Sequence, residues 1–480
     1  MTFIISFVQC ITGEEPCIKE HFLGFIPVEH SAGGALTETL LEQLEKMKIP
    51  VKNMRGQSYD NGANMKGKNS GVHRRILNIN PRVFYVPCTT HSLNLVLSDA
   101  AQSCLEAVEL FGILQQIYNF FESSTHRWTV LKRHVPSLTV KPLSQTRWES
   151  RINAVIPFRY QIGEIYDALL ELSIDERTDA LSKTLALSLV KKVKSFKFVA
   201  SVVIWHSILF RVNIISKMLQ SETIDVSTAV EMIGKTRQGM IEMRFEKGFQ
   251  QALVDARDLC DSLEIESEFS QESEIRPRKK RKQFDYESQD EAPLSPKRRF
   301  KQSFYFYILD VTISSLQERF EQLNAVNEKF GFLSNIKKVK QDEILNKCKD
   351  LHLALRDGYH IDIDGSQLYQ EILVMLTLLP KEVTTPLEIL TCLNLNRLAD
   401  NFPNLSVALR IFPTLPVTVT TGERSFSKLK LIKTYLRSSM SQERLVSLAT
   451  ISIERDLLQN IDIENIMKDF ADKKARKVIM

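Results

Sequence analysis

The segment from residue 55 to residue 101 constrains the fold of this 480-residue chain more than any other. It reads as two short strands, each followed by a helix. The first strand leads to Asp60 in a stretch of turn formers, and the second leads to a Cys-x-x-His sequence at Cys88 and His91. Parallel strands end at the same edge of a sheet, where ligands and metals collect. The pattern alone favours an ordinary αβ unit in which Asp60 only caps a turn.

The rest of the chain divides into a short α/β part and a long helical part. Residues 2–8 and 17–29 predict a hairpin of two strands, and residues 35–47 predict an amphipathic helix. Between about residues 148 and 381 the apolar residues recur at helical spacing, most densely over 169–198, 203–219 and 306–330. The sequence therefore predicts an α/β fold with a large all-α region.

The net charge, the cysteines and the lengths of the apolar runs indicate which partners and which compartment to expect. The net charge is only +5, so nucleic-acid affinity would have to come from local basic patches. The seven cysteines form no CxxC pairs, which indicates free thiols in a reducing compartment. No apolar run approaches the length of a membrane span, so we expect no membrane partner.

Four motifs carry a family resemblance. GQSYDNGANM, VPCTTHSLNL, SQTRWESR and VTVTTGERSFSKLKLIKTYLRSSMSQERLVSLATISIE occur in this order along the chain. Together they resemble the hAT superfamily of DNA transposases, most closely its domesticated vertebrate relatives of the zinc finger MYM type. The resemblance covers nearly the whole chain, although zinc fingers like those of the relatives are not found in it.

The resemblance implies a ribonuclease-H-like core that is interrupted by a helical insertion. Residues 1–147 would supply the first part of the core and residues 148–385 the insertion. Residues 386–480 would complete the core and mediate dimerisation. In relatives a central strand precedes the one at residues 2–8, and this sequence begins inside the latter. We therefore expect a core without its first strand, with a sheet that is either split or closed by direct pairing of the neighbouring strands.

The family uses three carboxylates to bind two metal ions that position a nucleophile for attack on DNA. The resemblance assigns the second carboxylate to Asp60 and the third to Glu423, and the first has no counterpart. Two carboxylates can still hold one Mg²⁺ ion, which is the cofactor that the acidic site would take. Without the resemblance, Glu423 would be read as a residue that stabilises the first turn of a helix.

Other residues of the motifs suit supporting roles. A zinc site needs four ligands, so Cys88 and His91 are better explained as a packed structural pair near the acids. Trp148 matches the family tryptophan that stacks on a flipped base, and Arg147 and Arg151 beside it suit phosphate contacts. A tryptophan that packs the first insertion helix is an equally good interpretation of Trp148.

Basic side chains also follow Glu423. Lys430, Lys433 and Arg437 are three and four residues apart, which would place them on one face of the helix that begins near Glu423. Such a stripe could meet DNA phosphates. A basic face that is simply exposed to solvent fits the same spacing.

A charged segment at residues 264–301 is predicted to be a disordered loop within the insertion. It holds two basic clusters that an import receptor could bind, and these predict a nuclear location. The first cluster contains Arg278, Lys279, Lys280, Arg281 and Lys282, and the second contains Lys297, Arg298 and Arg299. A solvated charged insertion is the alternative.

The apolar residues between 402 and 470 form a wide helical face, which can be buried by a second chain or within one chain. We expect a homodimer that acts as a catalytically inactive nuclear module for binding DNA or protein. The alternative is an active hAT transposase, with metal-dependent DNA cleavage and transfer, whose amino-terminal strand is not part of this sequence.

Overall fold

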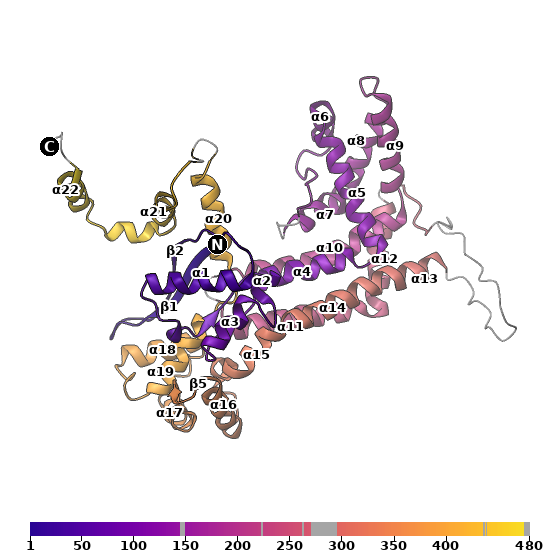
Figure 1. Ribbon diagram of the computed structural model, residues 1–480. Coiled ribbons are helices and arrows are strands. Elements are labelled where there is room, and N and C mark those ends of the chain that lie inside the picture. The colour runs from indigo at the N-terminus through magenta and orange to yellow at the C-terminus, as the bar shows by residue number, and fades with distance from the viewer. Residues whose placement is uncertain are drawn as a thin grey trace, which may run out of the picture. The chain divides into compact units, whose positions relative to one another are not determined.

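The computed structural model of the protein describes residues 1–144, 149–221, 224–261, 264–269, 295–434, 437 and 439–474. Within these residues the chain is mostly helical and contains three two-stranded sheets (Figure 1). It divides into two compact units. The first comprises residues 1–88, 223–227 and 322–480, and the second comprises residues 89–222 and 228–321. The expected combination of a small α/β part with a large helical part is therefore present in outline.

A hairpin opens the first unit, as the sequence predicts. Strand β1 (Thr2–Gln9) pairs antiparallel with β2 (Cys17–Phe25). The register shifts between Phe3 and Ile4, opposite Gly24, whose φ of +148° favours glycine. This irregularity lets Phe22 and Phe25 both enter a buried cluster.

The segment that constrains the fold forms a small parallel sheet. Strand β3 (Gly56–Gln57) pairs with β4 (Phe84–Tyr85), and α2 (Ala63–Lys66) and α3 (Val72–Ile79) lie between them in the chain. Helix α1 (Gly33–Lys46) packs on α3 through an apolar core. The buried members of this core are Leu36, Leu40, Leu44, Val72, Ile76 and Val83.

The β1–β2 and β3–β4 ladders are separate sheets in the part of the chain that the structure describes. Direct pairing of β1 with β3, one of the two expected arrangements, is therefore not found there.

Residues 321–414 add a helical layer to the first unit. Helix α17 packs on both α16 and α19, and α19 packs on α18 (Figure 1). The elements are α15 (Glu321–Phe330), η3 (Gly331–Asn335), α16 (Gln341–Ala354), β5 (Arg356–Asp357), β6 (His360–Ile361), α17 (Gly365–Leu378), α18 (Pro386–Leu395), α19 (Pro403–Ile411) and η4 (Phe412–Thr414). Most of this layer falls in residues 322–385, which the resemblance assigned to the insertion.

Helices α20 (Thr420–Ile432) and α21 (Gln442–Ile453) pack on the opening hairpin. Leu445 and Ala449 of α21 join Phe22 and Phe25 in one buried cluster. Glu454 reinforces this contact, because its carboxylate accepts a hydrogen bond from the Phe22 amide at 2.6 Å and lies 2.8 Å from the His21 ring. Part of the apolar face predicted for residues 402–470 is therefore buried within the chain.

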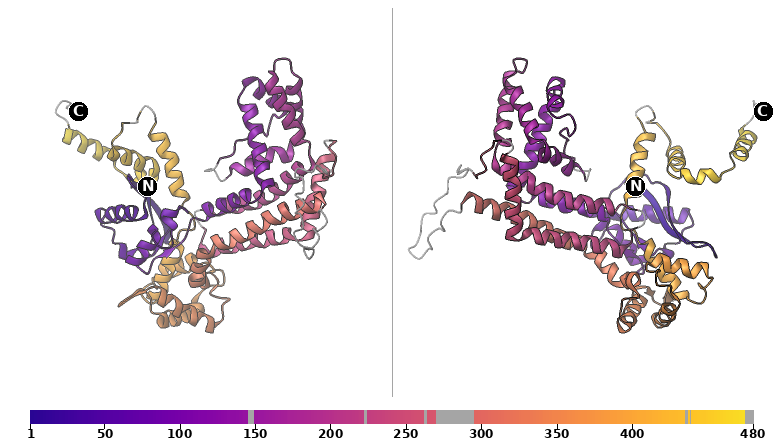
Figure 2. Two further views of the ribbon diagram at one scale, coloured as in Figure 1. Left: turned by 45° about the vertical axis from the view of Figure 1, so that its right-hand side comes forward. Right: turned by 180° about the vertical axis from the view of Figure 1, so that it is seen from behind.

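The second unit contains helices and no strand within its described residues. Helix α4 packs along α14 and also contacts α10 (Figure 2). The elements are α4 (Thr89–Gln102), α5 (Leu105–Glu122), α6 (Thr125–His134), α7 (Ser150–Tyr160), α8 (Ile162–Ile174), α9 (Ala180–Val193), α10 (Phe196–Met218), α11 (Val226–Arg244), α12 (Glu246–Asp261), α13 (Pro296–Phe300), the π-helix η2 (Lys301–Phe306) and α14 (Tyr307–Arg319). The apolar run 169–198 is not one helix, because Asp179 caps a new helix by accepting from the Ser182 amide at 2.9 Å.

Helix α10 also corrects an expectation from the sequence. It has 23 residues and is apolar enough to cross a membrane by length and composition, and 61% of its most apolar stretch is buried in the structure. Among the described residues no other helix passes this test. A buried helix at the centre of a helical unit has the same composition.

The described ends of the charged segment 264–301 are ordered, in contrast to the expected disordered loop. Phe269 lies between Phe196 and Phe300, with ring centroids 4.9 and 5.0 Å away. Residues 296–306 are helical and lead into α14. The prediction of disorder followed the charges of this segment and overlooked the aromatic residues that hold its ends. Residues 270–294 lie outside the described part.

Candidate functional site

The parallel ladder of the first unit ends at Asp60 and Cys88. Amides of the second strand donate to carbonyls of the first, from Phe84 to Arg55, from Val86 to Gln57 and from Cys88 to Tyr59, with N···O distances of 2.8, 3.0 and 3.1 Å. Asp60 follows the last of these rungs and is exposed, and its Oδ1 accepts a hydrogen bond from the Gly62 amide at 3.1 Å. The two ends therefore lie on one edge of the ladder, as the sequence predicts.

Cys88 links this edge to the helix that carries Glu423. Its buried Sγ accepts a hydrogen bond from the Val419 amide at 3.5 Å, and the Val419 carbonyl accepts one from the Glu423 amide at 3.2 Å. Glu423 is exposed in the first turn of α20, where a carboxylate is favoured by the helix dipole. Cys88 therefore bonds to Tyr59, the residue before Asp60, and to Val419, one helical turn before Glu423. That the carboxylates of Asp60 and Glu423 are within reach of one metal ion stays a prediction.

Cys88 and His91 occupy different settings. Cys88 is fully buried between β4 and α20 and supports the structure there. His91 is half-buried in the first turn of α4, the helix that begins the second unit. Within the described residues, no three histidine, cysteine or acidic side chains gather into a group that could hold a metal ion.

The rings of Tyr59, Tyr85 and His73 form a stack near Asp60, which was not predicted from the sequence. Tyr85 stacks on His73 at 4.4 Å between ring centroids and on Tyr59 at 6.4 Å. Burial, and then the charge of Asp60, raises the pKa of Tyr85, so its hydroxyl stays protonated. This hydroxyl is buried and makes no hydrogen bond within the described residues. Tyr59 directly precedes Asp60, and Tyr85 lies shortly before Cys88. These two tyrosines, each beside a motif, are the feature of the sequence from which the stack could have been predicted.

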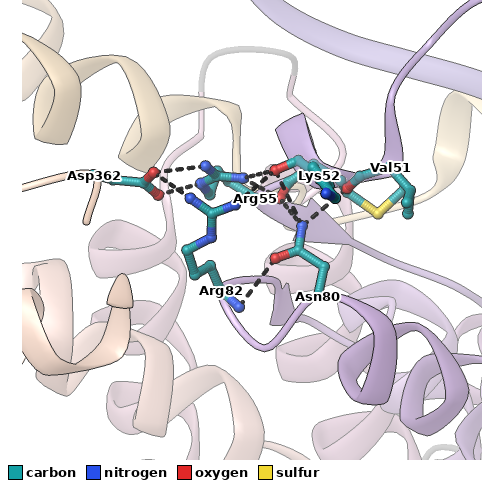
Figure 3. Close-up of polar contacts among 7 residues, drawn as sticks. Val51, Lys52, Arg55, Asn80, Arg82 and Asp362 are labelled. Carbon is teal, nitrogen blue, oxygen red and sulfur yellow. Dashed lines mark hydrogen bonds and ion pairs between the residues drawn. The ribbon is translucent and has the colours of Figure 1, made fainter. Parts of the chain in front are cut away.

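A network of hydrogen bonds and ion pairs holds the starts of β3 and β4, and it too was not predicted from the sequence (Figure 3). The Asp362 carboxylate, which follows β6, accepts hydrogen bonds from Arg55 at 2.5 and 2.7 Å and from Arg82 at 2.6 Å. Arg55 precedes β3 and Arg82 precedes β4. The Asn80 amide donates to the Val51 carbonyl at 2.9 Å and to the Met54 carbonyl at 3.0 Å. The network ties the entry of the ladder to a residue 280 positions from Arg82 and 307 positions from Arg55.

The predicted basic stripe on α20 is only partly correct. Lys430 is exposed in the last turn of the helix, but the helix ends at Ile432. Lys433 leaves the helical region with a ψ of 75°, and the Arg437 amide closes a separate turn on the Thr434 carbonyl at 2.9 Å. Lys433 and Arg437 therefore do not continue one helical face, although both are exposed.

Arg151 is held inside the second unit. Its Nη2 donates to the Ser98 hydroxyl at 3.2 Å, and burial lowers the pKa of its guanidinium. Arg147 and Trp148 lie outside the described residues, so the predicted stacking and phosphate contacts remain predictions.

Of the two basic clusters, Arg278, Lys279, Lys280, Arg281 and Lys282 lie outside the described residues. Lys297, Arg298 and Arg299 are exposed on α13, where the Ser295 hydroxyl accepts from the Arg298 amide at 3.4 Å. The second cluster is therefore helical and does not belong to a disordered loop as predicted, because Ser295 and Pro296 form a favourable helix start.

Comparisons with known proteins match both ends of the chain to family models. Residues 1–71, which include Asp60, match the "ZMYM1/FAM200, RNase-like domain". Residues 369–457, which include Glu423, match the "hAT family C-terminal dimerisation region". The chain is also similar to the protein named "52 kDa repressor of the inhibitor of the protein kinase". It is 22% identical to the mouse protein over 468 residues and 23% identical to the human protein over 467 residues. Each alignment covers 93% of this chain and 59% of the relative.

Proposed function

The chain is hAT transposase-derived, and on that premise we propose that it is a nuclear protein that dimerises, binds DNA and does not cut it. One observation carries this proposal. Cys88 bonds to Tyr59, which precedes Asp60 in the matched RNase-like domain, and to Val419, one helical turn before Glu423 in the matched dimerisation region. This connection through one cysteine supports the proposal that the two acid positions belong to one site.

Asp60 and Glu423 suit a role in binding. Their two exposed carboxylates can hold one Mg²⁺ through water, and a two-metal reaction would use a further carboxylate that bridges the ions. If bound, Mg²⁺ would supply a positive charge for a DNA phosphate, and Asp60 and Glu423 would hold it. Lys430, Lys433 and Arg437 lie exposed beyond Glu423 and would contact neighbouring phosphates.

We expect the purified chain to retard duplex DNA in a gel and to leave both strands intact with Mg²⁺ or Mn²⁺. Replacing Lys430 and Lys433 together by alanine should weaken retention and reduce the slope of the salt dependence by about one for each lysine that binds a phosphate. Lys191→Ala with Lys192→Ala, a pair of exposed lysines on α9, is the matched control and should bind normally.

Two outcomes would contradict parts of this proposal. Nicking that disappears in Asp60→Ala would establish an active enzyme. Absence of retardation at low salt would remove DNA binding while leaving the dimerisation proposal in place.

Nuclear location should depend on the first basic cluster. A tagged full-length chain is expected to accumulate in the nucleus, because the clustered positive charges suit the acidic grooves of an import receptor. Changing Lys279, Lys280, Arg281 and Lys282 to alanine should shift most of the signal to the cytoplasm, as seen by fluorescence microscopy. Removing the same number of charges elsewhere, at Lys191, Lys192, Lys235 and Lys247, should leave the nuclear signal unchanged. An unchanged location after loss of the cluster would refute this role.

A further inference from the structure

Helix α22 (Ile463–Lys474) presents an apolar stripe to solvent. Ile463, Ile466, Met467 and Phe470 recur at the spacing of one helical face, with 65%, 54%, 58% and 65% of each residue exposed. Every residue from 461 to 470 is exposed. Because an isolated helix of about 12 residues is marginal in water, α22 needs a surface to pack against.

The neighbouring apolar face is already covered by the chain itself. Leu445 and Ala449 of α21 are buried against β2, at 6% and 0% exposure. The matched dimerisation region ends at residue 457, just before the exposed stripe. The stripe is thus continuous with a region whose family role is self-association, and it lies outside the matched residues.

Acidic residues lie at the start of α22, at Asp462 and Glu464, where the helix dipole favours negative charge. A second copy that runs in the opposite direction would keep these acidic starts at opposite ends of the pair and would align the helix dipoles favourably. The middle of the stripe falls between Ile466 and Met467.

We propose that α22 pairs antiparallel with α22 of a second copy of this chain and buries the stripe formed by Ile463, Ile466, Met467 and Phe470. The inference rests on the self-association proposed above and assigns it a contact. The stripe of each helix fills the gaps of the other, and the polar residues of α22 remain in water.

Crosslinking tests the pairing and its direction. In a chain with the exposed Cys10 and Cys17 changed to serine, Met467→Cys should form a disulfide-linked dimer under mild oxidation. Ile463→Cys alone should not, because its partner in an antiparallel pair is residue 470. Ile463→Cys combined with Phe470→Cys should crosslink. Efficient crosslinking by Ile463→Cys alone would show a parallel pair and overturn the proposal.

Sedimentation equilibrium of the full chain tests the contact. Ile466→Asp and Phe470→Asp should each raise the dimer dissociation constant by about tenfold or more, because each removes a large buried apolar side chain. Leu181→Asp, at an 84% exposed apolar position on α9, should leave the constant unchanged.

The possible failures can be told apart. A wild-type dimer that is insensitive to both aspartates overturns the α22 pairing and leaves the proposed dimerisation intact. A wild-type chain that stays monomeric at micromolar concentration overturns both. If Ile466→Asp lowers the unfolding temperature of a chain that remains dimeric, α22 packs on its own chain and the pairing is again overturned.

Discussion

Replacing Asp362 by alanine is expected to lower the free energy of unfolding by about 3–5 kcal/mol, because it leaves two largely buried guanidinium groups without their carboxylate. The side chains of Arg55, Arg82 and Asp362 are only 16%, 9% and 13% exposed. Solvent therefore cannot replace the three hydrogen bonds that the carboxylate accepts. Urea denaturation followed by circular dichroism measures the change.

Asp357→Ala is the matched control for this substitution. Asp357 lies in the same short hairpin, at the end of β5, and makes no ion pair among the residues that the structure describes. The Asp357→Ala substitution should change the free energy of unfolding by less than about 0.5 kcal/mol, as is usual for substitutions that remove no buried contact. Equal losses for the two alanine variants would show that the hairpin as a whole matters and not the arginine network.

Phe330→Ala is expected to destabilise the protein by about 3–5 kcal/mol, the range for removing a large buried aromatic side chain. Phe330 ends α15 and is fully buried between Phe84 of β4 and Phe412 of η4. Its ring centroid lies 5.0 Å from that of Phe84 and 5.5 Å from that of Phe412. The substitution leaves a cavity between β4, the strand that leads to Cys88, and η4.

The same denaturation measurement tests this second expectation. Phe330→Leu retains most of the apolar volume and should recover a large part of the loss. If the alanine and leucine variants are equally stable, the stacked rings do not hold these segments together.

Local patterns in the sequence predict much of the site. Two short apolar runs indicate the opening hairpin, and the turn formers after Asp60 indicate where the strand ends. Glu423 lies in the first turn of a helix, as the sequence predicts. These predictions succeed because they depend on residues that are neighbours in the chain.

Other predictions are wrong because a spacing was continued past the end of a helix or because only charges were counted. The helix after Glu423 stops at Ile432, so the spacing of Lys430, Lys433 and Arg437 does not become one basic face. The end of the charged segment is helical because Ser295 and Pro296 start a helix, and Phe300 of that helix packs with Phe269. Charge counts alone could not reveal either feature.

The order of strands and helices, the turn at Asp60 and the apolar stripe of α22 all follow from residues within a few positions of one another, so the chain specifies them locally. Three other features required the folded molecule: Val419 reaches the thiol of Cys88, Asp362 joins Arg55 to Arg82, and Leu445 is buried while Phe470 is exposed. Each local stretch of the sequence could contact many others. Which contacts form is decided only when whole helices and strands pack together, so these pairs cannot be predicted from neighbouring residues.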